Sequence, residues 1–155
     1  MRNLPNDVEL GVGEARVRIT ALSARVVRLR FAAQGTFPAD FSFAVLPNAF
    51  PAPPEVDVKQ SAETVSFDTG AIQVRVVRSP FRVVFLNALG DIIEQNLPGY
   101  PPSYNGSAFR GWKSMPGDEH YFALGDKTGP LDHLNLAFSN WNTDQFGWQE
   151  STDPL

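Results

Sequence analysis

The stretch TVSFDTGAIQVRVVRSPFRVVFLNALGDII, residues 64–93, decides the fold class of this chain. Apolar and polar residues alternate within it, as in strands that bury one face, and Thr69-Gly70 and Ser79-Pro80 have the composition of turns. The strands expected here are residues 64–68, 72–77, 81–86 and 92–93. Short strands at regular spacing with turns between them predict an antiparallel β-sandwich or barrel.

The same alternation occurs nearer the N-terminus. Residues 16–20 (RVRIT) place Val17 and Ile19 on one face, and residues 27–31 repeat the pattern after a short connection at residues 23–25, so two adjacent strands are predicted. Arginines alternate with these apolar residues, and we expect them on the solvated face of the strands rather than in a polyanion site. They are arginines 16, 18, 25, 28 and 30.

The remaining segments favour loops. Residues 41–46 form a short apolar run, and residues 47–54 contain too much proline for a helix or a central strand. Residues 98–106 (PGYPPSYNG) read as a loop. Since no stretch shows sustained helical periodicity, the predicted class is all-β, with a loop-rich C-terminal segment.

Length and composition exclude several kinds of protein. The chain has 155 residues, 43% of them hydrophobic, which is enough for one domain with a sizeable core but not for a catalytic (β/α)8 barrel, which needs roughly 250 residues. Its formal net charge of −4 gives no footprint for nucleic acid or anionic lipid. The absence of cysteine excludes disulfides and thiolate metal sites.

The N-terminus lacks the continuous apolar core of a signal peptide, and no run approaches the roughly 20 residues of a membrane-spanning helix. We therefore predict a cytoplasmic protein with no membrane partner.

The most distinctive motifs lie near the C-terminus. They are YFALGD at residues 121–126, WNTD at residues 141–144 and DPL at residues 153–155. Their order resembles the end of the N-terminal domain in glycoside hydrolase family 31, whose members are mostly retaining α-glucosidases and α-xylosidases. Ala123 departs from the family pattern, where glycine is usual, but Gly125 retains the position that most needs a permissive backbone.

The resemblance implies a galactose mutarotase-like β-sandwich over residues 1–155, with residues 117–155 leading toward a catalytic barrel that follows it. The parent enzyme would hydrolyse α-glucosides or α-xylosides with two aspartates on barrel strands, and it would need no cofactor. The sandwich would support its own barrel and would contain no catalytic residue. A stand-alone carbohydrate-binding module is the alternative.

The substrate-site residues implied by the resemblance are Asp144, Trp141 and Asp126. Asp144 would accept hydrogen bonds from sugar hydroxyls, and Trp141 would offer an apolar wall to a pyranose face. Asp126 would order its turn and contribute to the same site. The alternatives are that Asp144 caps a turn and that Trp141 belongs to the core.

The other residues that could take part in catalysis or binding give weaker evidence for a functional site. A mutarotase needs a histidine and a glutamate that converge on a sugar, and Glu119, His120, Asp132 and His133 supply those residue types only in a terminal loop region. Their spacing matches no metal-binding motif, so no metal site is predicted. Four strand phenylalanines are expected in the core, namely those at 31, 67, 81 and 85. This leaves Tyr100, Tyr104 and Trp112 as the aromatic platform that a carbohydrate-binding module would need.

The segment from Gly117 to Leu155 also carries many large apolar residues, including Phe122, Leu131 and Leu136. Some of them should remain exposed where a barrel would pack. Because exposed apolar patches drive association, we expect the isolated chain to self-associate.

Overall fold

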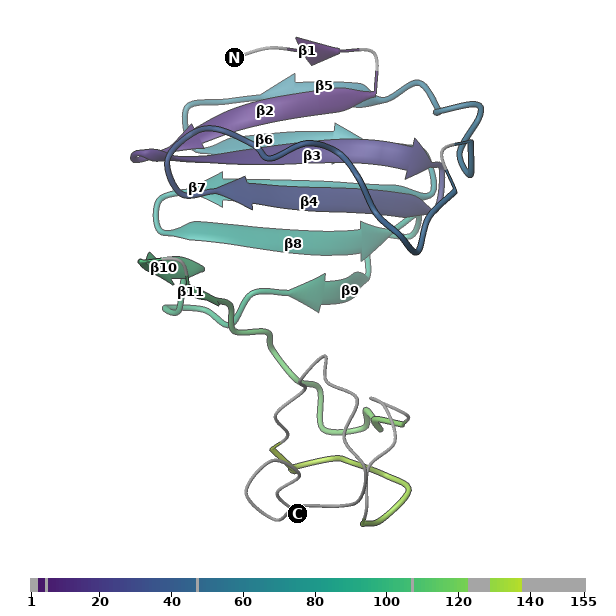
Figure 1. Ribbon diagram of the computed structural model, residues 1–155, viewed down its shortest axis with the longest axis vertical. Coiled ribbons are helices and arrows are strands. Elements are labelled where there is room, and N and C mark those ends of the chain that lie inside the picture. The colour runs from purple at the N-terminus through teal and green to yellow at the C-terminus, as the bar shows by residue number, and fades with distance from the viewer. Residues whose placement is uncertain (1–2, 5, 47, 107, 123–128, 138–155) are drawn as a thin grey trace. The chain divides into compact units, whose positions relative to one another are not determined.

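The fold was analysed in a computed structural model that describes residues 3–4, 6–46, 48–106, 108–122 and 129–137. The chain divides into two compact units, Met1–Ser114 and Met115–Leu155, and each is described by itself. The strands of the described residues all lie in the first unit, and the described residues of the second unit form turns and irregular structure (Figure 1).

The first sheet contains the N-terminal strands in the order β1-β2-β3-β4, all antiparallel. Its strands are β1 (Asn3–Leu4), β2 (Asp7–Val12), β3 (Ala15–Ser23) and β4 (Val26–Ala32). The register pairs Leu10 with Val17, and Val17 in turn with Phe31, so apolar residues of neighbouring strands share one face.

The second sheet is an antiparallel meander in the order β5-β6-β7-β8-β9. Its strands are β5 (Asp57–Gln60), β6 (Thr64–Asp68), β7 (Ile72–Arg78), β8 (Phe81–Asn87) and β9 (Ile92–Gln95). Four of these coincide with the strands predicted from residues 64–93, and the predicted turns lie between them. The Ser79-Pro80 peptide bond in the β7–β8 turn is cis.

The two sheets pack face to face in two layers, as the purple and teal strands of Figure 1 show. The core is a single cluster of fully buried apolar residues from both sheets. Its members are Val8, Leu10, Val17, Ile19 and Ala21 from β2 and β3, and Val65, Phe67, Val74, Val76 and Val83 from β6, β7 and β8. The predicted antiparallel β-sandwich is thus confirmed.

Five strands were not predicted from the sequence, namely β1, β2, β5, β10 and β11. The signal for β2 was present, because Val8, Leu10 and Val12 alternate with Glu9 and Gly11. The strand is stabilised by a complete ladder with β3, which tolerates the glycine in its interior.

The prediction that residues 98–106 form only a loop was partly wrong. Their last part is strand β10 (Ser103–Asn105), which pairs with β11 (Ala108–Arg110) in a short antiparallel hairpin. Aromatic packing explains the hairpin, since Tyr104 lies opposite Phe109 with ring centroids 5.1 Å apart, and Phe109 contacts Phe31 at 5.2 Å.

The aromatic predictions were largely right. Phe67 is completely buried, while Phe31, Phe81 and Phe85 are half-buried and pack against the core cluster. Phe81 meets the edge of Phe31 with ring centroids 6.3 Å apart, which is a favourable arrangement of two aromatic rings.

Candidate functional site

The residues predicted to contact substrate are outside the described part of the chain. Asp126, Trp141 and Asp144 all lie there. Their roles therefore stay predictions. The described residues nevertheless form two groups of interacting polar side chains, one on the first sheet and one in the second unit.

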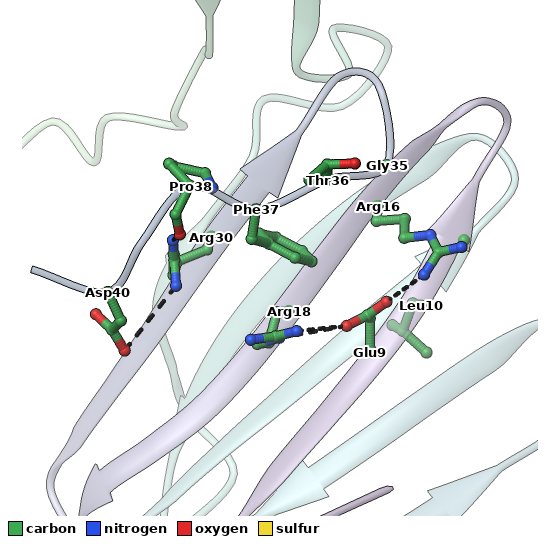
Figure 2. A pocket seen from close by; sticks show the side chains of 11 residues that line it. Glu9, Leu10, Arg16, Arg18, Arg30, Gly35, Thr36, Phe37, Pro38 and Asp40 are labelled. Atoms are coloured by element: carbon green, nitrogen blue, oxygen red, sulfur yellow. Dashed lines mark hydrogen bonds and ion pairs between the residues drawn. The ribbon is translucent and has the colours of Figure 1, made fainter. Parts of the chain in front are cut away.

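The first group occupies the outward face of the first sheet (Figure 2). Strand register places Glu9 of β2 opposite Arg18 of β3, and Arg18 opposite Arg30 of β4. Two like charges directly opposite each other are destabilising, so this row requires opposite charges on both sides. Glu9 supplies one, with its Oε2 accepting a 2.8 Å hydrogen bond from Arg18. Asp40 supplies the other, from the segment after β4, and lies 3.9 Å from Arg30.

Phe37 fills the space between the two arginines. The guanidinium carbon of Arg18 lies 4.5 Å from the centre of the Phe37 ring, and that of Arg30 lies 5.4 Å from it, so both cations contact the same π system. Arg30 also donates a 2.5 Å hydrogen bond to the carbonyl of Pro38. The segment from Gly35 to Asp40 is thereby held across the strands.

The arginines were predicted on a solvated face, and this was only partly right. The register does place Arg16, Arg18, Arg28 and Arg30 on the outward face, but the segment from Gly35 to Asp40 covers part of it. The cavity that remains between segment and sheet has a volume of about 730 Å³. The sequence lacked any local signal for this cover, because its partners are distant along the chain.

Pairing shifts the titration of both carboxylates in this cavity. Hydrogen bonds from Arg18 and then Arg16 hold the pKa of Glu9 below its ordinary value, and a bidentate contact from Arg28 lowers the pKa of Asp40. The hydrogen bond to Glu9 likewise raises the pKa of Arg18. Both carboxylates thus remain charged at neutral pH and form ion pairs with the arginines. This arrangement stabilises a loop and supplies no general acid or base near pH 7.

The second group lies in the second unit, around Asp132. Its carboxylate contacts Nδ1 of His120 at 2.6 Å and accepts backbone hydrogen bonds from Tyr121 and Leu134. The contact with His120 is the main reason that the pKa of Asp132 is lowered. Beside it, the Tyr121 hydroxyl donates a 2.5 Å hydrogen bond to Glu119.

This arrangement does not have the form that a mutarotase site requires. His120 is engaged by an aspartate of its own loop, and Glu119 is engaged by Tyr121. Asp132 accepts two backbone N–H groups, as a turn-ordering carboxylate does. His133 is buried, and its backbone N–H donates to the Tyr121 carbonyl at 2.7 Å. The group therefore orders the described part of this loop region.

Two further features are absent from the described residues. Within these ranges, no three His, Asp or Glu side chains come together in a way that would hold a metal ion. Among the same residues, no helix has the length and apolarity needed to cross a membrane.

The fold and the C-terminal motifs together define a mutarotase-like sandwich of the kind found in glycosidases, and comparison with known proteins specifies the family. The model of the glycosyl hydrolase 31 N-terminal galactose mutarotase-like domain matches residues 16–155. This chain therefore belongs to that domain family. The resemblance noted in the C-terminal motifs is confirmed.

Individual relatives agree with this assignment. The chain is 28% identical over 141 residues to alpha-glucosidase 2 of Bacillus thermoamyloliquefaciens, an alignment that covers 90% of the chain and 18% of the relative. A GH31 dextranase from Flavobacterium johnsoniae, solved in complex with isomaltotriose, superposes with a TM-score of 0.82 at 25% identity, over 96% of this chain and 19% of the dextranase.

A GH31 α-xylosidase from Xanthomonas citri shares the fold, with a TM-score of 0.60 at 19% identity over 77% of this chain and 14% of that enzyme. The chain thus spans less than a fifth of the length of each of these three proteins.

Proposed function

We propose that this chain is the N-terminal β-sandwich of a retaining α-glycoside hydrolase, in which it supports a catalytic barrel and contributes one loop to the substrate site. The observation that carries the proposal is the family match over residues 16–155, together with the small share of each relative that the chain covers. In this proposal the remainder of the protein contains the barrel and its two catalytic aspartates, and residues 117–155 lead into it.

An α-glucoside is the proposed substrate class. One relative is an α-glucosidase, and the structural neighbour with the highest similarity among those described is a dextranase in complex with isomaltotriose. An α-xyloside is the second possibility within the class, because an α-xylosidase shares the fold. We further propose a cytoplasmic location.

We assign Asp144 the role of accepting hydrogen bonds from sugar hydroxyls, with Trp141 and Asp126 shaping the same loop. The choice rests on chemistry and on motif position. A carboxylate accepts from two neighbouring hydroxyls at once, and such charge-assisted bonds contribute about 1.5–3 kcal/mol each.

The test uses the full-length parent protein and an aryl α-glucoside. The parent should hydrolyse it, the 155-residue chain alone should not, and Asp144→Asn in the parent should reduce kcat/KM by about ten- to a hundredfold with an unchanged melting temperature. A lower melting temperature with normal kinetics would instead identify Asp144 as a turn-capping residue. An inactive parent, assayed on both α-glucosides and α-xylosides, would overturn the proposed function.

A further inference from the structure

Two exposed aromatic side chains of the first unit lie side by side near the edge of the second sheet. The ring centroids of Tyr100 and Trp112 are 5.9 Å apart, with an interplanar angle of 48°. Tyr100 is 54% exposed and Trp112 is 37% exposed, although each side chain carries a large apolar ring. Their exposure needs an explanation, and the way they are held suggests one.

A tight turn fixes Tyr100. Residues 97–100 (LPGY) have proline at the second position and glycine at the third, which is the signature of a type II turn. The structure agrees, since Gly99 has a φ of 82° and the Tyr100 N–H donates to the Leu97 carbonyl at 3.1 Å. Only glycine adopts that φ without strain, so Gly99 determines where the tyrosine backbone lies.

Trp112 is held from the other side by the chain next to this turn. Its carbonyl accepts hydrogen bonds from the Leu97 N–H at 3.0 Å and from the Asn96 side-chain amide at 3.3 Å. Asn96 is itself buried, and its Oδ1 accepts from the Val83 N–H of β8 at 2.8 Å. The backbones of both aromatic residues are therefore connected to the core sheet and lie in fixed positions.

The polar tips of the two side chains remain available for a ligand. Within the part of the chain that the structure describes, neither the Tyr100 hydroxyl nor the Trp112 indole N–H hydrogen-bonds to another residue. Each ring therefore offers an apolar face and a free polar group at its margin. A sugar presents the complementary surface, because its C–H face packs on an aromatic ring while its hydroxyls bind polar groups beside it.

We propose that Tyr100 and Trp112 form a binding platform for an α-glucan. The tilt of the rings favours an α-linked chain. Flat, ribbon-like glucans need coplanar rings, whereas α-linked glucans curve, and rings inclined at 48° follow that curvature. The choice of glucose polymer rests on the proposed function, and the platform would keep an extended substrate near the enzyme.

The experiment measures binding of dextran, glycogen and isomaltotriose to the 155-residue chain, by affinity electrophoresis and by NMR titration of the tryptophan indole signals. We expect wild-type binding, and a loss of affinity of at least about tenfold in Trp112→Ala and in Tyr100→Ala. Phe43→Ala is the matched control, because Phe43 is 99% exposed in a different loop and should leave binding unchanged.

Gly99→Ala adds a test of geometry. It keeps both rings but strains the turn, so it should weaken glucan binding while Trp112 stays in place. Circular dichroism confirms that each variant is folded, and Trp112→Tyr, which keeps an aromatic face, should retain more affinity than Trp112→Ala.

The outcomes separate this proposal from the proposed function. No glucan binding by the chain, or binding that survives loss of both aromatic residues, overturns the platform even if the parent enzyme is active. Binding that depends on Tyr100 and Trp112 supports it even if the parent fails to hydrolyse α-glucosides.

Discussion

The two faces of the first sheet are organised by different interactions. Its inner face carries Val17 and Ile19 of β3, both completely or almost completely buried against the second sheet. On the outer face of the same strand, Arg18 lies between Glu9 and Phe37. Burial of the inner face depends only on residue type and alternation, whereas the outer face depends on partners placed by strand register and by a loop.

The two faces should therefore respond differently to mutation and to solvent. Apolar burial is insensitive to pH and salt and grows with the area removed from water. Paired charges at a partly exposed surface contribute less and depend on ionisation. Three substitutions test this contrast.

The largest effect should come from the core. Phe67 is completely buried between the sheets, and Phe67→Ala removes its ring and leaves a cavity, so the free energy of unfolding should fall by about 3–5 kcal/mol. Urea denaturation at constant pH measures it. Phe43→Ala, at a fully solvated phenylalanine, should change stability by less than about 0.5 kcal/mol. Similar losses in the two variants would mean that the sandwich core is not where the structure places it.

An intermediate effect is expected at Glu9. Glu9→Gln leaves Arg16 and Arg18 without their charged partner and should reduce stability by about 1–2 kcal/mol at pH 7. Since the folded-state pKa of Glu9 lies below the unfolded value of about 4.3, its contribution is complete above that value and is lost as pH falls through the lowered folded-state pKa.

The difference between wild type and Glu9→Gln should therefore be constant from pH 5 to pH 7 and shrink as the pH is lowered below about 4. Denaturation curves across this range measure it. Glu14→Gln is the control, because Glu14 is an exposed glutamate with no ion pair among the described residues. A difference that does not change with pH would show that the charge of Glu9 is unimportant.

The smallest effect should come from Phe37. Phe37→Ala removes the ring that both guanidinium groups contact and should cost about 0.5–1 kcal/mol, with faster hydrogen exchange across the segment from Gly35 to Asp40. Phe37→Leu keeps apolar area but not the π face. If the leucine variant matched wild type in stability and in exchange, packing rather than the cation–π contact would hold the segment.

The sequence predicted the fold well where residues alternate strongly. Strands β6, β7 and β8 were predicted from the alternation of apolar and polar residues and from the turns between them. Alternation along a strand shows which of its residues lie on the buried face. Strand β5 and the hairpin of β10 and β11 were missed because they are short and depend on pairing and aromatic packing across the fold. Short pairings of this kind leave only a weak local signal.

For the candidate sites too, some residues were predicted from the sequence, whereas their contacts in space were not. Motif order alone indicated the family, which the comparison with known domains confirmed. It also led to the assignment of Asp126, Trp141 and Asp144 to the substrate site, which stays a prediction. The contact of Arg18 with Phe37 was not predicted, because residues nineteen positions apart meet only when the loop after β4 folds back over the sheet. Tyr100 and Trp112 were predicted as platform residues, but their mutual geometry was not.

By itself, the sequence determined that this chain is an all-β domain, which residues of β3, β6 and β7 share an apolar face, and to which family it belongs. These properties follow from local alternation and from motifs, and both are formed by residues that are close together in the sequence. Only the tertiary structure decided that Glu9 and Asp40 form ion pairs with arginines of the outer face, and that Tyr100 and Trp112 lie 5.9 Å apart with their rings exposed. Such contacts join residues whose separation in space is set by strand register and loop closure, and neither can be read from local composition.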